Sequence, residues 1–370
     1  MAQHPILKIV SLTGCQSYLV GCPDTRQALL IDPKVGLEGQ YRQLLAAYGL
    51  HLVAIVDTHT HADHLSAAPN FAGPGVTVFM GRKTTVDRDV QRVGAGDRIA
   101  VGHLVFEVLD VPGHTPDSIA LLWRGTQHPS AVFTGDTLLL GGLARADFRG
   151  SDPVLLWDSV QHQLMSLPDD TLVFPGHSYD QVLFGTIGHE RETNAALAFA
   201  SARAYAEDLG ALEGSGNSKE VDEVLALNVT RNPKLPEKSS PVAACCAATH
   251  AGGGGGYSTT VIAEVAGDQL PEVHAGLEGP HQWVDVRDPH EVRAERIPGV
   301  THIALGELGF YLDHFRDQGR VYVSCRSGMR SLAAIRTLMR LGVCENPVNV
   351  AGGFLAWQDL GLPVENESLG

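Results

Sequence analysis

Between residues 5 and 190, short apolar runs alternate with glycine, aspartate and proline turns. Apolar runs of this length, bounded by turn residues, predict β-strands. Two longer segments, Leu37–Tyr48 and Pro153–Ser166, have helical periodicity, and Asp152 before Pro153 is a typical helix start. Because helices interrupt many strands, a layered α/β architecture is expected. The predicted strands are Ile6–Leu12, Tyr18–Gly21, Ala28–Ile31, Val53–Val56, Val76–Phe79, Leu104–Val111, Ser118–Trp123, Ala131–Thr134 and Leu172–Phe174.

The pattern changes after residue 190. Residues 190–240 are mostly helical in character, with a Gly-Ser-Gly-Asn-Ser break at 214–218, and a run of five glycines follows at Gly252–Gly256. Consecutive glycines lose so much conformational entropy on ordering that they usually form a flexible tether. We therefore expect a first domain over 1–242, a linker over 243–256 and a second domain over 257–370. Cys245 and Cys246 are interpreted as small residues of this linker.

From residue 257 the chain returns to a compact alternation of strands and helices. This alternation predicts a small doubly wound α/β domain with a parallel sheet. The expected elements are strands at Trp283–Val286, Val321–Ser324 and Val348–Val350, and helices at Asp288–Arg296 and Ser331–Leu341.

The first candidate for chemistry is a histidine cluster that follows the apolar run Leu52–Asp57. Its sequence, Thr58-His-Thr-His-Ala-Asp-His64, places three imidazoles and a carboxylate at the exit of a predicted strand. Imidazole and carboxylate together are ligands of zinc or iron. The cluster predicts a metalloenzyme.

Three further strand ends carry a single His or Asp directly after glycine. They are His114, Asp136 and His177, in the sequences Pro-Gly-His, Thr-Gly-Asp and Pro-Gly-His. Any one of these tripeptides is weak evidence, but four such loops in one order predict a shared metal cleft.

These ligands allow two kinds of metal chemistry. If all seven residues bind metal, Asp136 bridges two ions and a bridging hydroxide attacks an ester or thioester. If only His59, His114 and Asp136 bind, they form the two-histidine, one-carboxylate face typical of ferrous iron and dioxygen. The other four residues then orient ligands and bound water, and these are His61, Asp63, His64 and His177.

The amino-acid composition and net charge limit the classes of partner that the protein is expected to bind. The 370 residues are 44% hydrophobic and 19% charged, which is ordinary for a globular protein, and the net charge of −15 argues against nucleic acid or an anionic membrane as partner. The six cysteines show no disulfide or zinc-ribbon spacing. Without a signal-peptide pattern or a long apolar run, a cytoplasmic protein is expected. A homodimer is one assembly that the sequence allows.

The second candidate for chemistry is a cysteine loop between a predicted strand and a predicted helix. Cys325 is followed by Arg326, Ser327, Gly328, Met329, Arg330 and Ser331. Backbone N–H groups in such a loop form an anion cradle, and the helix N-terminus adds partial positive charge. With two arginines nearby, the loop is expected to lower the thiol pKa of Cys325 and to stabilise a thiolate or a persulfide.

The metal motif resembles the metallo-β-lactamase superfamily, which implies an αββα sandwich over about residues 5–200. The stretches Gly135–Leu139, Gly142–Phe148 and Pro175–Tyr179 look like the persulfide dioxygenases, the mononuclear-iron branch. That resemblance implies one Fe(II) per chain, with Arg145 and Tyr179 as contacts of glutathione persulfide. Two departures concern substrate positioning: Leu143 stands where some members carry cysteine, and Asp117 follows Pro116 where glycine is common.

The cysteine loop resembles the rhodanese active site, and the resemblance extends over about residues 257–366. Asp285-Val-Arg287, Arg296-Ile-Pro-Gly299 and Gly352-Gly-Phe354 with Trp357 match that family's frame. Phosphatases place five residues between cysteine and arginine, whereas only four separate Cys325 from Arg330, so phosphate would fit poorly. Sulfur transfer is favoured.

Together the two resemblances imply a persulfide dioxygenase fused to a rhodanese. The expected substrates and products are glutathione persulfide, O2, glutathione, sulfite and thiosulfate. The alternative is a dinuclear zinc thioester hydrolase of the glyoxalase II type, with two Zn per chain and a rhodanese or non-catalytic docking domain.

Overall fold

The protein is described here by a computed structural model that covers residues 4–12, 14–209, 219–230, 262–277 and 282–366. It divides into two compact units, one formed by Met1–Tyr179 and Phe184–Gly256, the other by Asp180–Leu183 and Tyr257–Gly370. The predicted break at 214–218 and the predicted linker at 243–256, with Cys245 and Cys246, lie outside the described residues. The domain limits given above therefore remain a prediction.

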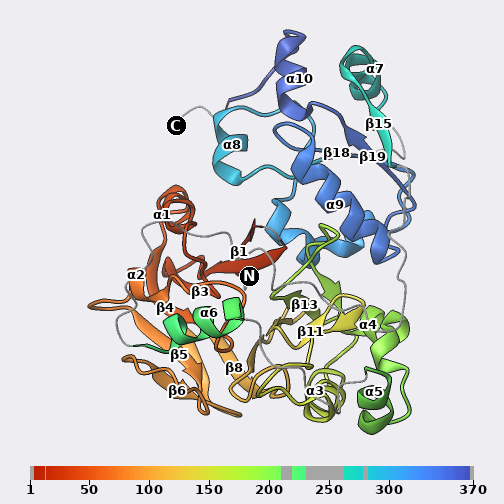
Figure 1. Ribbon diagram of the computed structural model, residues 1–370. Helices are drawn as coiled ribbons and strands as arrows, with labels where there is room; N and C mark the ends of the chain where they lie inside the picture. Colours follow the sequence, from red (N-terminus) through yellow and green to blue (C-terminus); the bar gives the residue numbers. More distant parts are fainter. Residues whose placement is uncertain (1–3, 13, 210–218, 231–261, 278–281, 367–370) are drawn as a thin grey trace. The chain divides into compact units, whose positions relative to one another are not determined.

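The first unit begins with a six-stranded sheet in the order β1-β2-β3-β4-β5-β6. Its outer face packs on helix α1 (Glu38–Ala47), whose Tyr41 shares a cluster of buried side chains with Leu19, Leu30 and Ile55 of the sheet (Figure 1). A short helix, α2 (Ala68–Phe71), follows β4. The strands are β1 (Ile6–Leu12), β2 (Cys15–Gly21), β3 (Gln27–Ile31), β4 (His51–Val56), β5 (Thr77–Gly81) and β6 (Gln91–Val93).

A second six-stranded sheet has the order β14-β13-β10-β9-β8-β7. Helix α3 (Pro153–Ser159) continues as a π-helical turn over Val160–Leu164, and Val160 and Leu164 pack on Leu122, Val132 and Val173 of this sheet. The strands are β7 (Arg98–Val101), β8 (Leu104–Asp110), β9 (Ile119–Trp123), β10 (Ala131–Gly135), β13 (Leu172–Pro175) and β14 (Gly185–Thr186), with a separate hairpin of β11 (Leu138–Leu139) and β12 (Gly142–Leu143).

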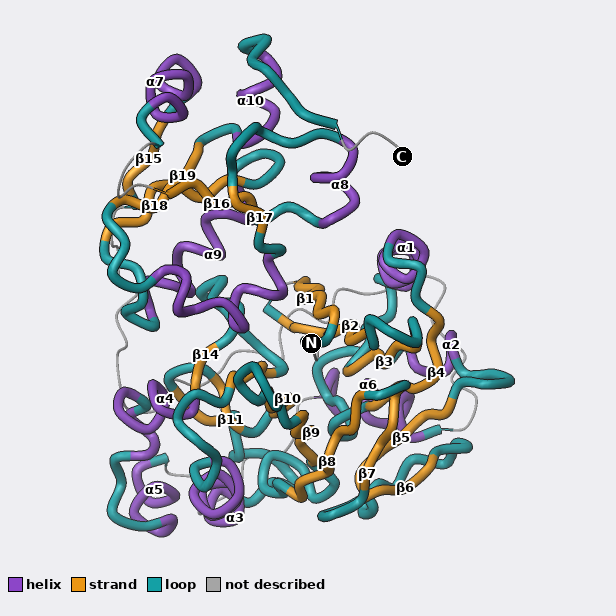
Figure 2. Tube along the Cα trace, turned by 180° about the vertical axis from the view of Figure 1, so that it is seen from behind, coloured by secondary structure: helices purple, strands orange, loops and turns teal. Residues whose placement is uncertain are grey.

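Aromatic rings join the two sheets. Tyr18 of β2 meets Phe133 of β10 with ring centroids 5.1 Å apart, and Phe174 of β13 at 5.6 Å. The Tyr18 hydroxyl also donates to the carbonyl of Pro175, 2.5 Å away. With α1 outside one sheet and α3 outside the other, the layers are αββα, and the expectation from the sequence is confirmed (Figure 2).

Helix starts follow the local chemistry that the sequence predicts. Asp152 caps α3 by accepting a hydrogen bond from Leu155 N at 3.0 Å, directly before Pro153. The described part of the segment 190–240, which the sequence predicts to be mostly helical, contains α5 (Ala202–Asp208), α6 (Lys219–Val229) and the end of α4 (Ile187–Thr193). Within the described residues, no helix is both long and apolar enough to span a bilayer.

The second unit contains a five-stranded sheet, β15-β19-β18-β16-β17, in which every pair of neighbours is parallel. Trp283, Tyr322, Phe354 and Trp357 dominate the buried cluster on one face. This is the doubly wound α/β domain that the sequence predicts. Its elements are β15 (Ala263–Val265), α7 (Leu270–Ala275), β16 (Gln282–Asp285), α8 (Pro289–Ala294), β17 (Thr301–His302), β18 (Arg320–Ser324), α9 (Met329–Arg340), β19 (Asn346–Val350) and α10 (Gly353–Asp359).

Gly113, directly before His114, has the backbone angle φ +142°, and a Cβ there would collide with backbone atoms of Leu156 in α3. We expect Gly113→Ala to lower the free energy of unfolding of the first unit by more than about 2 kcal/mol, because backbone strain and steric overlap add. Gly142→Ala is the matched control, since a Cβ at Gly142 meets nothing within 4 Å. Urea unfolding followed by circular dichroism compares the two variants, and equal losses would contradict the steric argument.

Candidate metal centre and cysteine loop

Four strand ends of the first unit bring the predicted ligands together. The loop after β4 carries His59, the turn after β8 carries His114, Asp136 directly follows β10, and His177 lies just beyond β13. The four residues are buried, with 2%, 6%, 8% and 6% of their surface exposed, respectively. Segments far apart in the sequence therefore meet in one buried cluster.

His59, His114 and Asp136 form a group whose ligand atoms all lie within 4.8 Å of one another. The His59 Nε2 atom lies 3.9 Å from Asp136 Oδ2, and the His114 Nε2 atom lies 3.8 Å from the same oxygen. Two donor atoms that bind the same ion at about 2.0–2.2 Å lie slightly closer together than the 3.8 and 3.9 Å measured between these nitrogens and the Asp136 oxygen. The spacing therefore suits a metal ion shared by the three side chains.

The state of these side chains also suits a metal. His59 Nε2 is buried and has no hydrogen-bond partner, which costs free energy unless a ligand occupies that position. Burial lowers the pKa of His59 to about 3, so its imidazole is neutral and can donate a lone pair. Burial opposes ionisation of Asp136, but His177 and its neighbours hold the Asp136 pKa below its ordinary value. The three residues fit a metal cofactor.

Asp32 orients His59 through Thr58. Asp32 lies at the end of β3 and accepts hydrogen bonds from Thr58 N at 2.7 Å and from Thr58 Oγ1 at 2.8 Å. Because the hydroxyl proton is used in this way, Thr58 Oγ1 accepts from His59 Nδ1 at 3.0 Å, which leaves Nε2 for the metal. Sequence reasoning missed Asp32, since it precedes Thr58 by 26 residues and lies on another strand.

His114 is oriented by a main-chain atom. Its Nδ1 donates to the carbonyl oxygen of Arg145 at 2.9 Å, so that Nε2 again faces Asp136. The Arg145 guanidinium itself forms two hydrogen bonds with Asp147, at 2.8 and 3.2 Å. The backbone of the residue predicted as a substrate contact thus fixes a metal-ligand candidate, a role that the sequence did not reveal.

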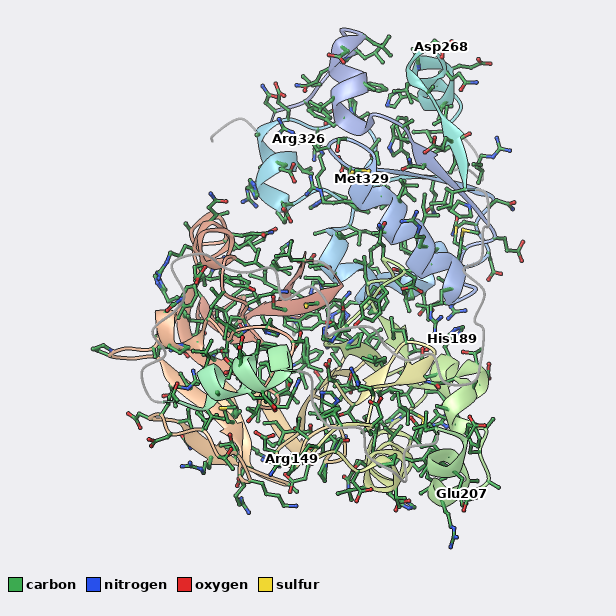
Figure 3. The ribbon with its side chains drawn as sticks, in the orientation of Figure 1. Arg149, His189, Glu207, Asp268, Arg326 and Met329 are labelled. Carbon is green, nitrogen blue, oxygen red and sulfur yellow. The ribbon has the colours of Figure 1, made fainter. Side chains whose placement is uncertain are left out.

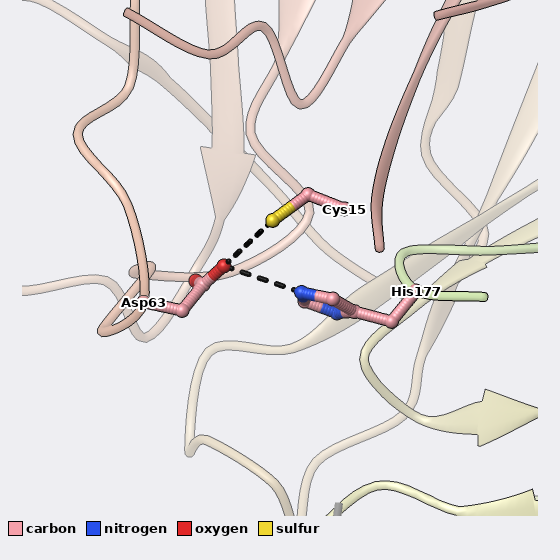
Figure 4. A group of neighbouring side chains, drawn as sticks. All are labelled: Cys15, Asp63 and His177. Carbon is pink, nitrogen blue, oxygen red and sulfur yellow. Dashed lines mark hydrogen bonds and ion pairs between the residues drawn. The ribbon is translucent and has the colours of Figure 1, made fainter. Parts of the chain in front are cut away.

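The remaining four predicted residues lie around this group. His177 Nδ1 donates to Asp136 Oδ1 at 2.7 Å, and His177 Nε2 lies 3.3 Å from Asp63 Oδ2 (Figure 4). His64 Nδ1 donates to the same Asp63 oxygen at 2.8 Å, whereas His61 Nε2 faces Asp32 Oδ1 at 3.2 Å. All four are buried. The structure brings every residue of the predicted motif into one cluster.

Tyr179, the second predicted substrate contact, lies at the surface next to this cluster. Its ring stacks on His177 with centroids 5.8 Å apart and an angle of 16° between the planes. The side chain is 41% exposed, in contrast to the buried histidine beneath it. A solute reaching His177 from solvent would therefore meet Tyr179.

Asn228 of α6 holds the histidine loop in place. Its amide nitrogen donates to the carbonyl oxygens of His61 and His64 at 2.9 and 2.8 Å, and its amide oxygen accepts from Ser66 N at 3.1 Å. Asn228 is 5% exposed, so all three hydrogen bonds are buried. The contact gives a structural role to α6, which lies in the segment that the sequence predicts to be mostly helical.

In the second unit, Cys325 lies between β18 and α9, as predicted. The thiol is buried, Gly328 N donates to Sγ at 3.1 Å, and Ser331 Oγ lies 3.7 Å from Sγ. Arg326, Ser327 and Met329 form the exposed rim of the loop, and Figure 3 labels Arg326 and Met329 near the start of α9. The lowered thiol pKa expected from the sequence remains a prediction.

The Arg330 side chain forms ion pairs with acidic residues at the start of α8. Its guanidinium forms hydrogen bonds with both carboxylate oxygens of Glu291, at 2.7 and 2.8 Å, and it also reaches Asp288 at 3.4 Å. The loop is closed on its other side by Gly353, at φ +56°, because a Cβ there would collide with the Cys325 carbonyl oxygen. The ion pairs of Arg330 and the close approach of Gly353 thus support the loop on two sides.

Both parts of the chain resemble known proteins. The human protein "Persulfide dioxygenase ETHE1, mitochondrial" is 34% identical over 183 residues, which span 49% of this chain and 70% of the relative. The crystal structure of ETHE1 from Myxococcus xanthus is 35% identical and covers 60% of this chain and 97% of its own, with a TM-score of 0.56. The chain belongs to the persulfide dioxygenase family. The fold is thus the expected metallo-β-lactamase-like sandwich.

The chain also resembles hydrolases. A hydroxyacylglutathione hydrolase from Polaromonas sp. (strain JS666 / ATCC BAA-500) is 38% identical over 193 residues, which span 49% of this chain and 69% of the relative. The Rhodanese-like domain family matches residues 269–360. The similarity to persulfide dioxygenases and this match together confirm the prediction of a persulfide dioxygenase module joined to a rhodanese-like module.

Because Asn228 supplies both donors to the histidine loop, we expect Asn228→Ala to weaken metal binding by about 10- to 100-fold, the usual effect of losing an outer contact of a metal site. It should also lower the free energy of unfolding by about 1–3 kcal/mol, since buried carbonyl groups lose partners. Chelator competition measures the first effect and urea unfolding the second.

Glu223→Gln, at an exposed position of the same helix, is the control and should change neither quantity. Unaltered metal affinity in Asn228→Ala would show that α6 does not support the loop.

Proposed function

We propose that the chain is a bifunctional enzyme of sulfur metabolism. Its first unit oxidises glutathione persulfide with O2 and water to sulfite and glutathione, and its second unit transfers sulfane sulfur through Cys325. The proposal is carried by one observation: the His59–His114–Asp136 donor group occurs in a member of the persulfide dioxygenase family. The name of the human relative gives the reaction class.

Fe(II), one per chain, is the metal that this donor group suits best, because two imidazoles and one carboxylate leave open positions for substrate and O2. When bound, the iron supplies the redox chemistry with dioxygen. His59 and His114 are held with Nε2 toward Asp136 by Thr58 and by the Arg145 carbonyl. The protein therefore presents its ligands in fixed orientations before substrate arrives.

Arg145 and Tyr179 are the proposed contacts of the glutathione part of the substrate. Tyr179 is exposed above His177, and the Arg145 side chain is 29% exposed beside Asp147. Both therefore lie where a bulky, polar thiol could reach them from solvent. His61, Asp63, His64 and His177 would hold the ligands and ordered water around the metal.

In the second unit, the Cys325 thiolate would attack the outer sulfur of thiosulfate, releasing sulfite and leaving a Cys325 persulfide. Glutathione would then take this sulfur to form glutathione persulfide and regenerate the thiol. The support for this step is the loop geometry, in which Gly328 N and Ser331 Oγ approach Sγ at the N-terminus of α9.

The second candidate function is thioester hydrolysis by two zinc ions. It is favoured by the similarity to hydroxyacylglutathione hydrolase and by the burial of all seven motif residues in one cluster. It predicts two zincs per chain and no O2 consumption. On that alternative, the rhodanese-like domain is a sulfurtransferase or a docking module.

Metal content and oxygen uptake with glutathione persulfide decide between the two candidates. We expect about one iron per chain, with O2 consumption and sulfite release. His59→Ala should abolish the uptake and leave thiosulfate-dependent sulfur transfer largely intact, since Cys325 lies in the other unit. Two zincs without uptake would instead establish the hydrolase, and loss of both activities in a folded variant would refute their independence.

Cys325→Ala should abolish thiosulfate-dependent sulfur transfer, because no other residue of the loop can carry the sulfur as a persulfide. Production of sulfite from thiosulfate in the presence of glutathione measures the loss. Cys344→Ala is the control, since Cys344 is buried near the end of α9 and away from the loop. Full transfer activity in Cys325→Ala would remove this residue from the mechanism.

A further inference from the structure

Asn349 is a buried polar residue of the second unit that none of the proposed reactions uses. It lies in β19, where residues 347–350 are all buried, and only 2% of its surface is exposed. Burying an asparagine amide costs free energy unless both its oxygen and its nitrogen find hydrogen-bond partners. The partners of Asn349 connect a surface carboxylate with the loop of Cys325.

The amide nitrogen of Asn349 is held by the exposed Glu264 of β15. Parallel pairing of β15 with β19 places Glu264 opposite Asn349 in the register, and Asn349 Nδ2 donates to Glu264 Oε1 at 2.8 Å. Because an ionised carboxylate can only accept, turning the amide over would bring two acceptor oxygens together. Glu264 therefore fixes the amide with its oxygen, Oδ1, toward Ser331.

The amide oxygen of Asn349 attracts the hydroxyl proton of Ser331. Ser331 Oγ lies 2.7 Å from Asn349 Oδ1 and 2.9 Å from the carbonyl oxygen of Gly328. The third acceptor within reach is Cys325 Sγ, 3.7 Å from Ser331 Oγ. A hydroxyl has one proton and cannot serve three acceptors at once. Since Gly328 O also accepts from Leu332 N, the proton is directed to Asn349 and away from the sulfur.

The direction of this proton matters for the charge on Cys325. Donors that point at the sulfur stabilise a thiolate, and Gly328 N provides one at 3.1 Å. For Ser331 to provide a second donor, its hydroxyl must turn away from Asn349, whose buried oxygen then loses its partner. A persulfide carries its charge on the outer sulfur, so its Sγ does not need this donor. Glu264 and Asn349 thus disfavour the free thiolate relative to the persulfide.

We propose that Asn349 and Glu264 are positioning residues for sulfur transfer, which hold the Ser331 hydroxyl away from the reactive sulfur and so favour the persulfide form of the loop. This role rests on the proposed sulfur transfer through Cys325. In the loading step the Cys325 thiolate bonds to the outer sulfur of thiosulfate, the sulfur–sulfur bond of thiosulfate breaks, and its electron pair leaves with sulfite. Thiolate and thiosulfate carry the same total charge as persulfide and sulfite.

The other charged groups around the loop stay the same in every variant of the test. Among the described residues, those that line or support the loop are Arg326, Arg330, Asp285, Arg287, Asp288 and Glu291. Arg330 pairs with Glu291 and Asp288, and Asp285 pairs with Arg287, whereas Arg326 is exposed. A change in the titration of the thiol therefore reports on the substituted side chain.

The pH dependence of alkylation in the full-length protein tests the role. Iodoacetamide reacts with the thiolate, and mass spectrometry of the Cys325 peptide separates this cysteine from the other five. We expect Glu264→Ala to lower the pH of half-maximal reaction by at least about half a unit, because the freed amide can turn its nitrogen to Ser331 and release the hydroxyl proton to the sulfur. Asn349→Leu should shift this pH in the same direction, since it removes the acceptor.

A Ser331→Ala background separates the orientation of the hydroxyl from a simple effect of charge. In that background Glu264→Ala should cause no further shift, and a shift that persists would refute the path through Ser331. Asp268→Ala is the control for loss of an exposed negative charge in the same unit, and it should keep the wild-type value. A shift in Asp268→Ala as large as in Glu264→Ala would overturn the assignment to the amide contact.

Exchanging donor and acceptor provides a conservative rescue. In the double variant Glu264→Gln/Asn349→Asp, the glutamine nitrogen can donate to the new carboxylate, which again presents an acceptor to Ser331. The pH of half-maximal alkylation should then return to the wild-type value or rise above it, opposite to the shift in Glu264→Ala. Circular dichroism shows whether each variant is folded. A folded double variant that shifts downward like Glu264→Ala would contradict the proposal.

Loading with sulfur gives the second measurement. Above the pH of half-maximal alkylation and at a fixed ratio of thiosulfate to sulfite, the ratio of Cys325 persulfide to thiolate should fall by about threefold in Glu264→Ala, which corresponds to about half a pH unit. Unchanged alkylation and loading in Glu264→Ala and Asn349→Leu would refute the role of both residues. A wild-type Cys325 that takes no sulfur from thiosulfate would instead refute the proposed sulfur transfer, while the alkylation data would still test the contact with Ser331.

Discussion

The arrangement of the metal cluster in the first unit depends on the buried carboxylate of Asp136. Oδ2 faces the imidazoles of His59 and His114, and Oδ1 accepts a hydrogen bond from His177. A buried anion is costly unless cations or hydrogen-bond donors surround it. Of these three contacts only that of His177 is a hydrogen bond, because Nε2 of His59 and of His114 carries a lone pair, so a cation shared by the three side chains would complete the neutralisation of the carboxylate. The ends of β4, β8, β10 and β13 converge on this carboxylate, which links the packing of the two sheets with the chemistry of the site.

Much of the fold could be predicted because buried strands leave a strong pattern. Every residue of β10 is buried, and its apolar run marked the strand plainly. By contrast, β6 and β7 were missed because exposed polar residues such as Gln91 and Arg98 break their apolar character. The hairpin β11–β12 has only two residues in each strand, too few for any periodicity.

The sequence allowed the metal-ligand candidates to be predicted, but not the residues that hold those ligands in place. His59, His114 and Asp136 follow recognisable strand ends, so position along the chain indicated their role. Asp32 and Asn228 act through contacts across 26 and more than 160 residues, and no local pattern reports such contacts. Arg145 was singled out for its side chain, yet its carbonyl oxygen, which every residue type possesses, orients His114.

The hydrogen bonds that Asn228 forms with the histidine loop also have a consequence for the order of folding. Its hydrogen bonds to the histidine loop join residues 162 to 167 positions apart, whereas all seven predicted ligands lie within residues 59–177. Asn228 is synthesised after all seven of these residues, so its hydrogen bonds to the loop can form only once the ligand-bearing segments are already present. A nascent chain would thus hold a complete ligand set before α6 emerges from the ribosome. Binding of the metal ion and formation of the Asn228 hydrogen bonds would then be separate steps of folding.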